Sequence, residues 1–217
     1  MLREVISYDW LTGFLILGLV AITVSKMVYT SRFFDFLGLI GNSKYLKIYS
    51  RDQKFIDSFD SLLFINLTLT IATFSFLAYN SIVAPLEFNL ALFLKLVFAI
   101  AAIVLIKVLI ERLIGSLFDI DEVVDAYLFQ KTSFKNFTGF ILLPINALLL
   151  FSVSLNSVVV FSVIGLIVII NLIGFISSFK TYQKLLLNNL FYFILYLCAL
   201  EIGPYVILYK VFIEYNA

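Results

Sequence analysis

Two charged residues, Glu201 and Lys95, stand inside long hydrophobic runs and are the first candidates for chemistry in this chain. A charge near the middle of a bilayer costs about 2.5 kcal/mol or more, so it normally has a partner or a function. Counted along helices, the two residues differ in depth by about one turn, which a lysine side chain can span. Pro204 cannot donate to the carbonyl of Leu200, so it loosens the helix beside the carboxylate. We expect Glu201 and Lys95 to pair, either to fix helix packing or to handle protons or a substrate.

The sequence contains few of the residues and motifs on which other kinds of catalysis depend. It has no histidine and a single cysteine, Cys198, which excludes intramolecular disulfides and sites that rely on imidazole or paired thiolates. No P-loop, dinucleotide or metalloprotease motif is present. We therefore predict no catalytic residues, no cofactor and no metal site, and we favour a protein that is not an enzyme.

An acidic run follows the third predicted membrane span and consists of Asp119, Asp121, Glu122 and Asp125. Its spacing lacks the glycine and the final bidentate glutamate of a calcium loop. The run forms the polar side of a predicted amphipathic helix whose apolar stripe is Leu113, Leu117, Ile120, Val124, Tyr127 and Leu128. We expect this acidic cytoplasmic face to contact another protein or the basic helix described below, and a solvated face without a partner is the plain alternative.

The elements that carry these residues are predicted membrane-spanning helices. Between Asn136 and Phe179 the chain runs for 44 residues without Asp, Glu, Lys or Arg, whereas one helical crossing needs about 20 apolar residues. Hydrophobic residues make up 63% of the sequence and charged residues 13%, far outside the range of soluble domains. We predict an all-α polytopic membrane bundle of about six helices, forming one integral membrane domain over residues 1–217. The expected spans are 10–29, 61–82, 88–110, 137–154, 158–179 and 190–211.

Three asparagines lie within other predicted spans, and they are Asn66, Asn146 and Asn171. Amide side chains in membrane helices commonly bond across to a neighbouring helix. We expect interhelical hydrogen bonds from each of them.

Basic residues in the connections predict the orientation of the bundle. The first, third and fifth connections are rich in Lys and Arg, whereas the second and fourth contain neither. By the positive-inside rule the first, third and fifth connections are cytoplasmic. Both termini are therefore expected outside the cytoplasm.

The first connection is predicted to contain a basic amphipathic helix. From Ser43 to Phe59, basic residues recur at three- and four-residue spacing while Tyr and Ile residues fall largely on other faces. The basic residues are Lys44, Lys47, Arg51 and Lys54. We expect this helix to lie along anionic lipid headgroups at the cytoplasmic face, and docking of an acidic protein is the alternative.

Two segments of the sequence resemble a known family. The first is RFFDF at 32–36 followed by NSKYLKIY at 42–49, and the second is FYFILYLCALEIGP at 191–204 with YK at 209–210. The sequence resembles, over nearly its whole length, the DUF4271 family of Bacteroidota membrane proteins. The resemblance implies a multi-pass protein of a Gram-negative inner membrane, so that the predicted outer termini are periplasmic. It supplies no catalytic residues, because the family's name records an unknown function.

A non-enzymatic inner-membrane subunit, or an assembly or scaffold factor of a cell-envelope complex, is the function we favour from sequence. Short outer loops, the lack of cofactor ligands and amphipathic cytoplasmic helices suited to docking support it. The alternatives are a small transporter or channel that uses Glu201 and Lys95, or an enzyme or enzyme partner acting on a lipid-linked substrate. Expected partners are the lipid bilayer with its anionic lipids and either another membrane protein or a second copy of this chain. Nucleic acid is not expected.

The predicted orientation leads to a labelling experiment. Cysteines introduced at Ser7 and Asn216 should react with a membrane-impermeant thiol reagent added to intact cells, and one at Ser50 should not, because the charge asymmetry places only the termini outside. Labelling at Ser50 with both ends protected would reverse the orientation.

Overall fold

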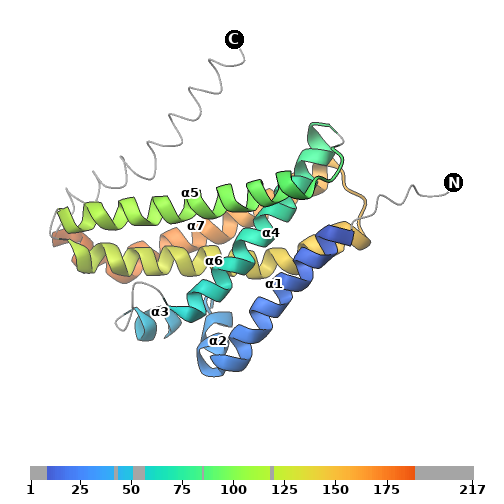
Figure 1. The fold of residues 1–217 in the computed structure, drawn as a ribbon. Coiled ribbons are helices and arrows are strands. Elements are labelled where there is room, and N and C mark those ends of the chain that lie inside the picture. The colour runs from blue at the N-terminus through green and yellow to red at the C-terminus, as the bar shows by residue number, and fades with distance from the viewer. Residues whose placement is uncertain (1–8, 42–43, 51–56, 85, 118–119, 189–217) are drawn as a thin grey trace, which may run out of the picture.

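The computed structural model describes residues 9–41, 44–50, 57–84, 86–117 and 120–188, and this part of the chain is mostly α-helical. The helices in chain order are α1 (Asp9–Val28), α2 (Thr30–Leu37), α3 (Lys44–Tyr49), α4 (Ser58–Ile82), α5 (Leu90–Leu117), α6 (Asp121–Phe151) and α7 (Ser157–Asn188), as Figure 1 shows. Five of them, α1, α4, α5, α6 and α7, are long and apolar enough to cross a membrane. The predicted all-α polytopic fold is confirmed. The sixth predicted span, 190–211, lies outside the described residues.

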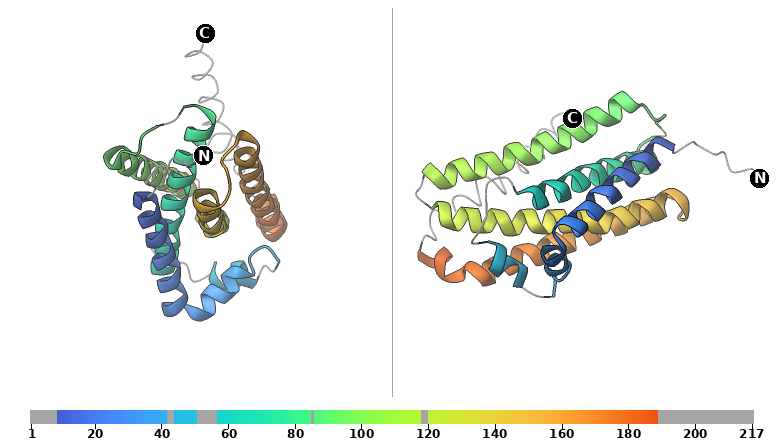
Figure 2. Two further views of the ribbon diagram at one scale, coloured as in Figure 1. Left: turned by 90° about the vertical axis from the view of Figure 1, so that its right-hand side faces the viewer. Right: turned by 60° about the horizontal axis from the view of Figure 1, so that its bottom comes forward.

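α6 occupies the centre of the bundle. It packs against α1, α4, α5 and α7, and α1 and α4 cross the direction of α5 and α6 obliquely (Figures 1 and 2). The start of α1, the α4–α5 connection and the α6–α7 connection lie toward one end of the bundle (Figure 1). α2, α3 and the α5–α6 turn lie toward the other end, which we call the basic end because the first and third connections meet there.

α5 and α6 form a hairpin of unusually long helices. They contain 28 and 31 residues, about 42 and 46 Å at a helical rise of ~1.5 Å, against a hydrocarbon core of ~30 Å. A Cβ atom on Gly115 would lie 2.9 Å from Cβ of Val124, so the missing side chain lets the two helices meet at the turn. The single amphipathic helix predicted across this region is therefore wrong. Its stripe is divided, with Leu113 and Leu117 exposed on α5 and Val124 and Tyr127 buried on α6.

α3 is shorter than the basic helix predicted for the first connection. It covers six residues, and residues 51–56 lie outside the described part. Asp57 has extended backbone, with φ −106° and ψ 130°, and its side chain caps α4 by accepting a hydrogen bond from the amide of Phe59 at 3.2 Å. A helix cap needs a non-helical backbone, so one continuous helix from Ser43 to Phe59 is ruled out.

Two clusters of buried side chains fill the bundle. The cluster near the basic end is largely aromatic and includes Phe36, Tyr45, Phe59, Phe129 and Phe137. The other cluster is mainly aliphatic and includes Leu11, Leu15, Leu77, Leu142 and Val160. Edge-to-face ring contacts are frequent in the first cluster, as between Phe36 and Phe59 with centroids 5.9 Å apart. Such pairs add about 0.5–1.5 kcal/mol to the area that they bury.

Between these clusters α1, α4 and α6 approach one another closely, and we call this level the waist. A Cβ atom on Gly139 of α6 would lie 2.7 Å from Cα of Leu67 of α4. A Cβ atom on Gly18 of α1 would lie 2.9 Å from Oδ1 of Asn66 of α4 and 3.1 Å from Cδ1 of Leu143 of α6. Membrane helices pack through such small residues, because lipid gives no hydrophobic drive for their association.

The predicted interhelical hydrogen bonds of the asparagines are confirmed for two of the three. Asn146 Nδ2 of α6 donates to the carbonyl of Thr70 of α4 at 2.8 Å, and Asn171 Nδ2 of α7 donates to Oγ1 of Thr138 of α6 at 3.2 Å. Asn66 is fully buried, and in the described structure its amide has no hydrogen-bond partner. The prediction for Asn66 is therefore wrong, since its side chain instead packs against Gly18.

The waist generates a test of packing. Gly139→Ala should lower the free energy of unfolding by about 1–3 kcal/mol, because the new methyl group meets backbone of α4 and the two helices must separate. Gly165→Ala is the matched control, since a Cβ there has nothing within 4 Å; it should be neutral or stabilise by up to about 1 kcal/mol. Unfolding in mixed micelles followed by circular dichroism measures both. Equal effects of the two substitutions would show that α4 and α6 do not meet at Gly139.

Candidate functional site

Lys95 lies exposed on α5, among the exposed apolar side chains of Leu92, Leu94 and Phe98. Glu201 and Pro204 lie outside the described residues. The predicted pairing of Glu201 with Lys95 therefore stays a prediction. What the structure adds is that Lys95 projects from the bundle instead of into its described core.

A different carboxylate, Glu111 of α5, is buried. Its side chain is 0% exposed, and its Oε1 lies 2.6 Å from Nζ of Lys131 of α6 and 3.9 Å from Nζ of Lys107 one turn earlier on α5. The other oxygen, Oε2, is buried and has no hydrogen-bond partner in the structure as described. Breaking a buried pair of this kind leaves an uncompensated charge, which is strongly destabilising. Glu111 and Lys131 therefore fasten α5 to α6 electrostatically.

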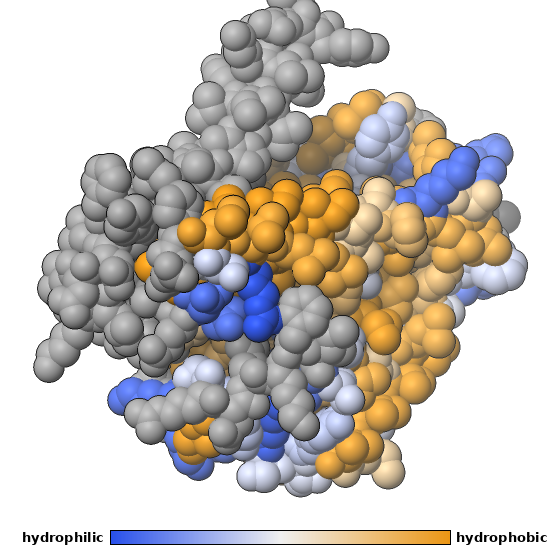
Figure 3. All heavy atoms as spheres, turned by 60° about the vertical axis from the view of Figure 1, so that its left-hand side comes forward, coloured by the Kyte–Doolittle hydropathy of each residue, from blue (hydrophilic) through white to orange (hydrophobic). Residues whose placement is uncertain are grey.

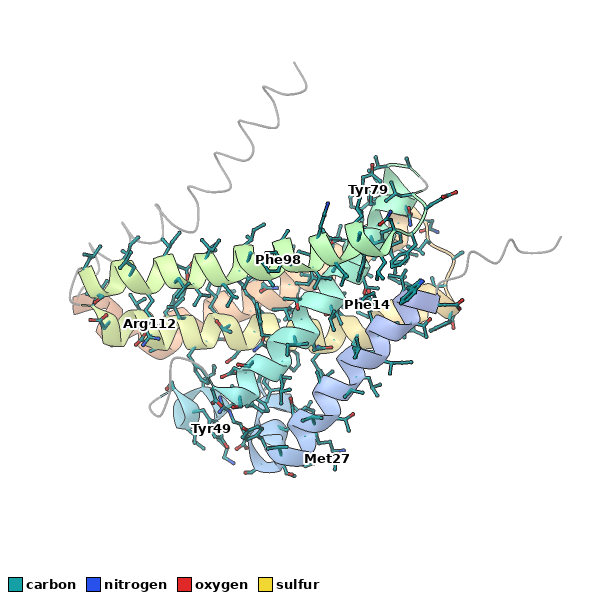
Figure 4. The ribbon with its side chains drawn as sticks, viewed as in Figure 1. Phe14, Met27, Tyr49, Tyr79, Phe98 and Arg112 are labelled. Atoms are coloured by element: carbon teal, nitrogen blue, oxygen red, sulfur yellow. The ribbon has the colours of Figure 1, made fainter. Side chains whose placement is uncertain are left out.

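A second, more exposed pair joins the same two helices. Arg112 Nε of α5 lies 3.3 Å from Oδ1 of Asp125 of α6, near the end of the hairpin where Figure 4 labels Arg112. Asp125 belongs to the predicted acidic face, and it contacts α5, not the basic residues of α3. Of the other members, Asp121 is exposed at the start of α6, Glu122 follows it in that helix, and Asp119 lies outside the described residues.

The Arg32 cluster is the other group of charges at the basic end, and it consists of Arg32 of α2 with Asp57 and Asp60. The guanidinium makes an ion pair with Asp57, and its second amino group lies 2.9 Å from Oδ2 of Asp60. The rings of Tyr49 and Phe59 lie 5.0 and 4.7 Å from its Cζ, within cation–π range. Since Asp57 also caps α4, the cluster ties α2 to the start of α4.

Tyr45 of α3 packs directly behind this cluster. Its ring is fully buried and stacks on Phe129 of α6 with centroids 5.6 Å apart. Burial raises the pKa of the Tyr45 hydroxyl far above its usual value, and nearby Asp60 adds to the increase. Burial by itself would lower the pKa of Arg32, but Tyr45, Asp60 and Asp57 together raise it. Arg32 therefore stays charged and Tyr45 neutral at physiological pH.

The predicted basic face is divided in the structure. Lys44 Nζ donates to Oδ1 of Asp35 at 2.9 Å, and this hydrogen bond raises the pKa of Lys44. Lys47 is exposed, whereas Arg51 and Lys54 lie outside the described residues. Viewed from the basic end, the surface shows hydrophilic patches directly beside hydrophobic ones (Figure 3). Polar and apolar side chains therefore share the surface at the basic end. They come from several elements, whereas the sequence predicted them on one helix.

Sequence reasoning missed both charged clusters. Glu111 directly follows the predicted span 88–110, so the sequence pattern placed it in a loop. Lys107 lies four residues earlier, and that spacing could have indicated an ion pair on a longer helix. Arg32 stands 25 and 28 residues before its two carboxylates. No local spacing indicates that contact, which only the fold creates.

These clusters join neighbouring helices. Arg32 pairs with two carboxylates across α2 and α4, and Glu111 pairs with Lys131 across α5 and α6. Among the residues that the structure describes, no group of three or more His, Cys, Asp or Glu side chains is arranged to hold a metal ion. Long apolar faces of α1, α5 and α7 are exposed, and that of α5 also carries Lys95. Part of α2 and α3 is exposed as well.

The Glu111–Lys131 pair can be tested against its exposed neighbour. Glu111→Ala should lower the free energy of unfolding by about 3–5 kcal/mol, because Lys131 loses its buried counter-charge. Asp125→Ala should cost about 1 kcal/mol or less, since both members of its pair are more than a third exposed. Detergent unfolding curves of the two variants give the comparison. Combining Glu111→Gln with Lys131→Met should recover much of the loss, and equal small losses for both alanine variants would contradict the role of the buried pair.

The comparisons with known proteins identify one family. Neither the curated proteins nor the solved structures gave a match. One family did match, described as a domain of unknown function (DUF4271), over residues 11–212. This range covers nearly the whole chain and includes all seven described helices except the first two residues of α1. The chain belongs to the DUF4271 family.

Proposed function

We propose that this protein is a non-enzymatic subunit or assembly factor of a cell-envelope complex in a bacterial inner membrane, and that it docks through the outward face of α5. The observation that carries the proposal is the surface of that helix. α5 has 28 residues, and its buried members are Phe93, Glu111 and Gly115. The rest of its length offers a long apolar surface. Of its three cationic residues, Lys107 and Arg112 lie near carboxylates of α5 and α6 toward the basic end, whereas Lys95 is exposed among apolar side chains.

Lys95 distinguishes this surface from one that only faces lipid. An ammonium group within a membrane span is costly unless it reaches water at the interface or has a counter-charge. A carboxylate on another transmembrane helix supplies that counter-charge and gives the contact its specificity. Glu201 in the predicted sixth span is one such carboxylate in this chain, and a partner subunit is the other source.

The orientation belongs to the same proposal. The first and third connections, which are rich in Lys and Arg, lie toward the same end of the bundle (Figure 1). This follows because successive spans run in opposite directions. With that end in the cytoplasm, the termini are periplasmic and the Arg32 and Glu111 clusters face the cytoplasm. Lys95 then lies near the periplasmic side of α5.

Site-specific photocrosslinking in cells tests the docking face. A photoreactive phenylalanine analogue at Phe98, which is 74% exposed and labelled on α5 in Figure 4, should give a discrete adduct larger than this chain. The same analogue at Phe76, which is buried in the bundle, is the matched control and should give none. Lys95→Met should weaken the adduct at Phe98, because the counter-charge on the partner loses its contact.

The outcomes separate the sources of the counter-charge. An adduct with a second protein that also co-purifies in mild detergent supports the subunit role. An adduct confined to this chain, abolished by Glu201→Gln, would assign the face to the predicted sixth span and remove the main support for a docked partner.

A small transporter is the second candidate, and buried polar side chains favour it. Asn66 and Asn136 are fully buried in α4 and α6, and within the described structure their amides have no hydrogen-bond partner. A buried amide without a hydrogen-bond partner is costly inside a membrane bundle. A polar solute that passes between α4 and α6 would supply the missing hydrogen bonds. Solute flux in proteoliposomes that is lost in Asn136→Leu while the protein stays folded would favour transport over scaffolding.

A further inference from the structure

α2 runs across the bundle at its basic end. It is seen almost end-on in Figure 1, where α5 and α6 are seen lengthwise, and it is seen lengthwise in the left view of Figure 2, where α5 and α6 are seen nearly end-on. A helix that lies across the spanning helices at their end has the direction of the membrane plane. This is the orientation of an interfacial helix.

α2 is apolar on two sides, of which only one is covered by protein. Phe33 and Phe36 are buried, and the Phe36 ring packs edge-to-face on Phe137 of α6 with centroids 5.7 Å apart. On the other side Phe34 is 58% exposed and Leu37 38% exposed. Ile40, just beyond the helix, is also exposed.

The exposed side of α2 is continuous with a membrane-spanning surface. Met27 and Val28 form the last turn of α1 and are strongly exposed, and only Tyr29 separates them from α2. The backbone hydrogen bonds continue through this junction, since Tyr29 N donates to Ser25 O at 3.0 Å and Phe33 N donates to Tyr29 O at 2.8 Å. The lipid-facing surface of α1 therefore passes directly into the outer side of α2.

The Arg32 cluster holds that outer side in place. Arg32 lies on α2 and is fixed by Asp57 and Asp60 at the start of α4. Rotation of α2 to bury Phe34 would break both contacts and expose Phe36. In the described fold, α2 therefore keeps Phe34 and Leu37 exposed. We call this exposed side of α2, with Ile40, the apolar edge.

The two helices next to α2, α1 and α3, each carry an exposed lysine. Lys26 lies in the last turn of α1 and Lys47 in α3, and both are exposed. Arg51 and Lys54 follow α3 in the sequence. An apolar edge with cations on the neighbouring helices matches the boundary between acyl chains and anionic headgroups, where each nearby lysine adds to binding.

We propose that α2 and α3 form an interfacial lipid-binding platform. Phe34, Leu37 and Ile40 insert at the boundary between headgroups and acyl chains of an anionic leaflet. Lys26 and Lys47 bind the lipid phosphates. This surface is separate from the outward face of α5, so the proposal does not depend on the subunit role.

Tryptophan fluorescence in the full-length protein tests the platform, because Trp10 is the single tryptophan of the chain. In a Trp10→Phe background, Phe34→Trp is reconstituted into mixed phosphatidylglycerol and phosphatidylcholine vesicles that carry bromines at shallow or deep acyl positions. We expect stronger quenching by shallow bromines than by deep ones, and weak quenching by acrylamide. Leu17→Trp in the same background is the control, since Leu17 is exposed near the middle of α1 and should be quenched more by deep bromines.

Lipid preference is measured in the same vesicles. When only the phosphatidylglycerol is brominated, the Phe34→Trp variant should be quenched more than when only the phosphatidylcholine is brominated. Lys26→Gln and Lys47→Gln should each reduce the relative association of phosphatidylglycerol by about fivefold. Leu17→Trp should show no such preference or dependence on the lysines.

Several outcomes would overturn the platform. Quenching of Phe34→Trp by acrylamide alone would place this side in water, and quenching by no reagent would show that protein covers it, as in a second copy or a partner subunit. Stronger quenching by deep bromines than by shallow ones would place α2 within the hydrocarbon. Equal quenching by the two brominated lipids would rule out selection of anionic headgroups.

Discussion

The close approach of α4 and α6 at the waist is the constraint on which the rest of the bundle depends. Lipid offers apolar surroundings to every helix, so burial of apolar area does not by itself bring two spans together. Here α4 and α6 are brought together by Gly139, which has no side chain and lies directly against the backbone of α4 at Leu67. Gly18 brings α1 to the same level. Once these three helices cross there, their side chains above and below must form two separate clusters.

The charged clusters complete the arrangement at one end of the bundle. Arg32 is neutralised by two carboxylates, and Glu111 by at least one lysine. Each cluster joins a helix outside the waist to one within it, namely α2 to α4 and α5 to α6. These groups pair with one another within the protein. They are well placed to hold α2 and the end of the hairpin in fixed positions.

Two of the exposed surfaces differ in chemistry from the mainly apolar faces of the other spans. The outward face of α5 is apolar along most of its length and carries Lys95, a combination suited to another transmembrane helix with a carboxylate. The outer edge of α2 is short, lies across the spans and has Lys26 and Lys47 on the neighbouring helices, which suits a layer of anionic headgroups.

The sequence by itself determined that the chain is a membrane protein, the apolar centre of each described span, and which connections share a side, because hydrophobic length and loop charge are local properties of the chain. It did not give the full lengths of α5, which extends to Leu117, and α6, which begins at Asp121, beyond the predicted 88–110 and 137–154. It also indicated the interhelical bonds of Asn146 and Asn171, since an amide within a span has few other partners. The tertiary structure alone decided that Gly139 is a contact point, that Asn66 lies against Gly18 without a hydrogen bond, and that Arg32 pairs with Asp57 and Asp60. It also decided that Glu111 is buried and that the stripe from Leu113 to Leu128 is divided by a turn. Those features join residues on different helices, and their energies depend on which helices cross and at what level, which local spacing does not specify.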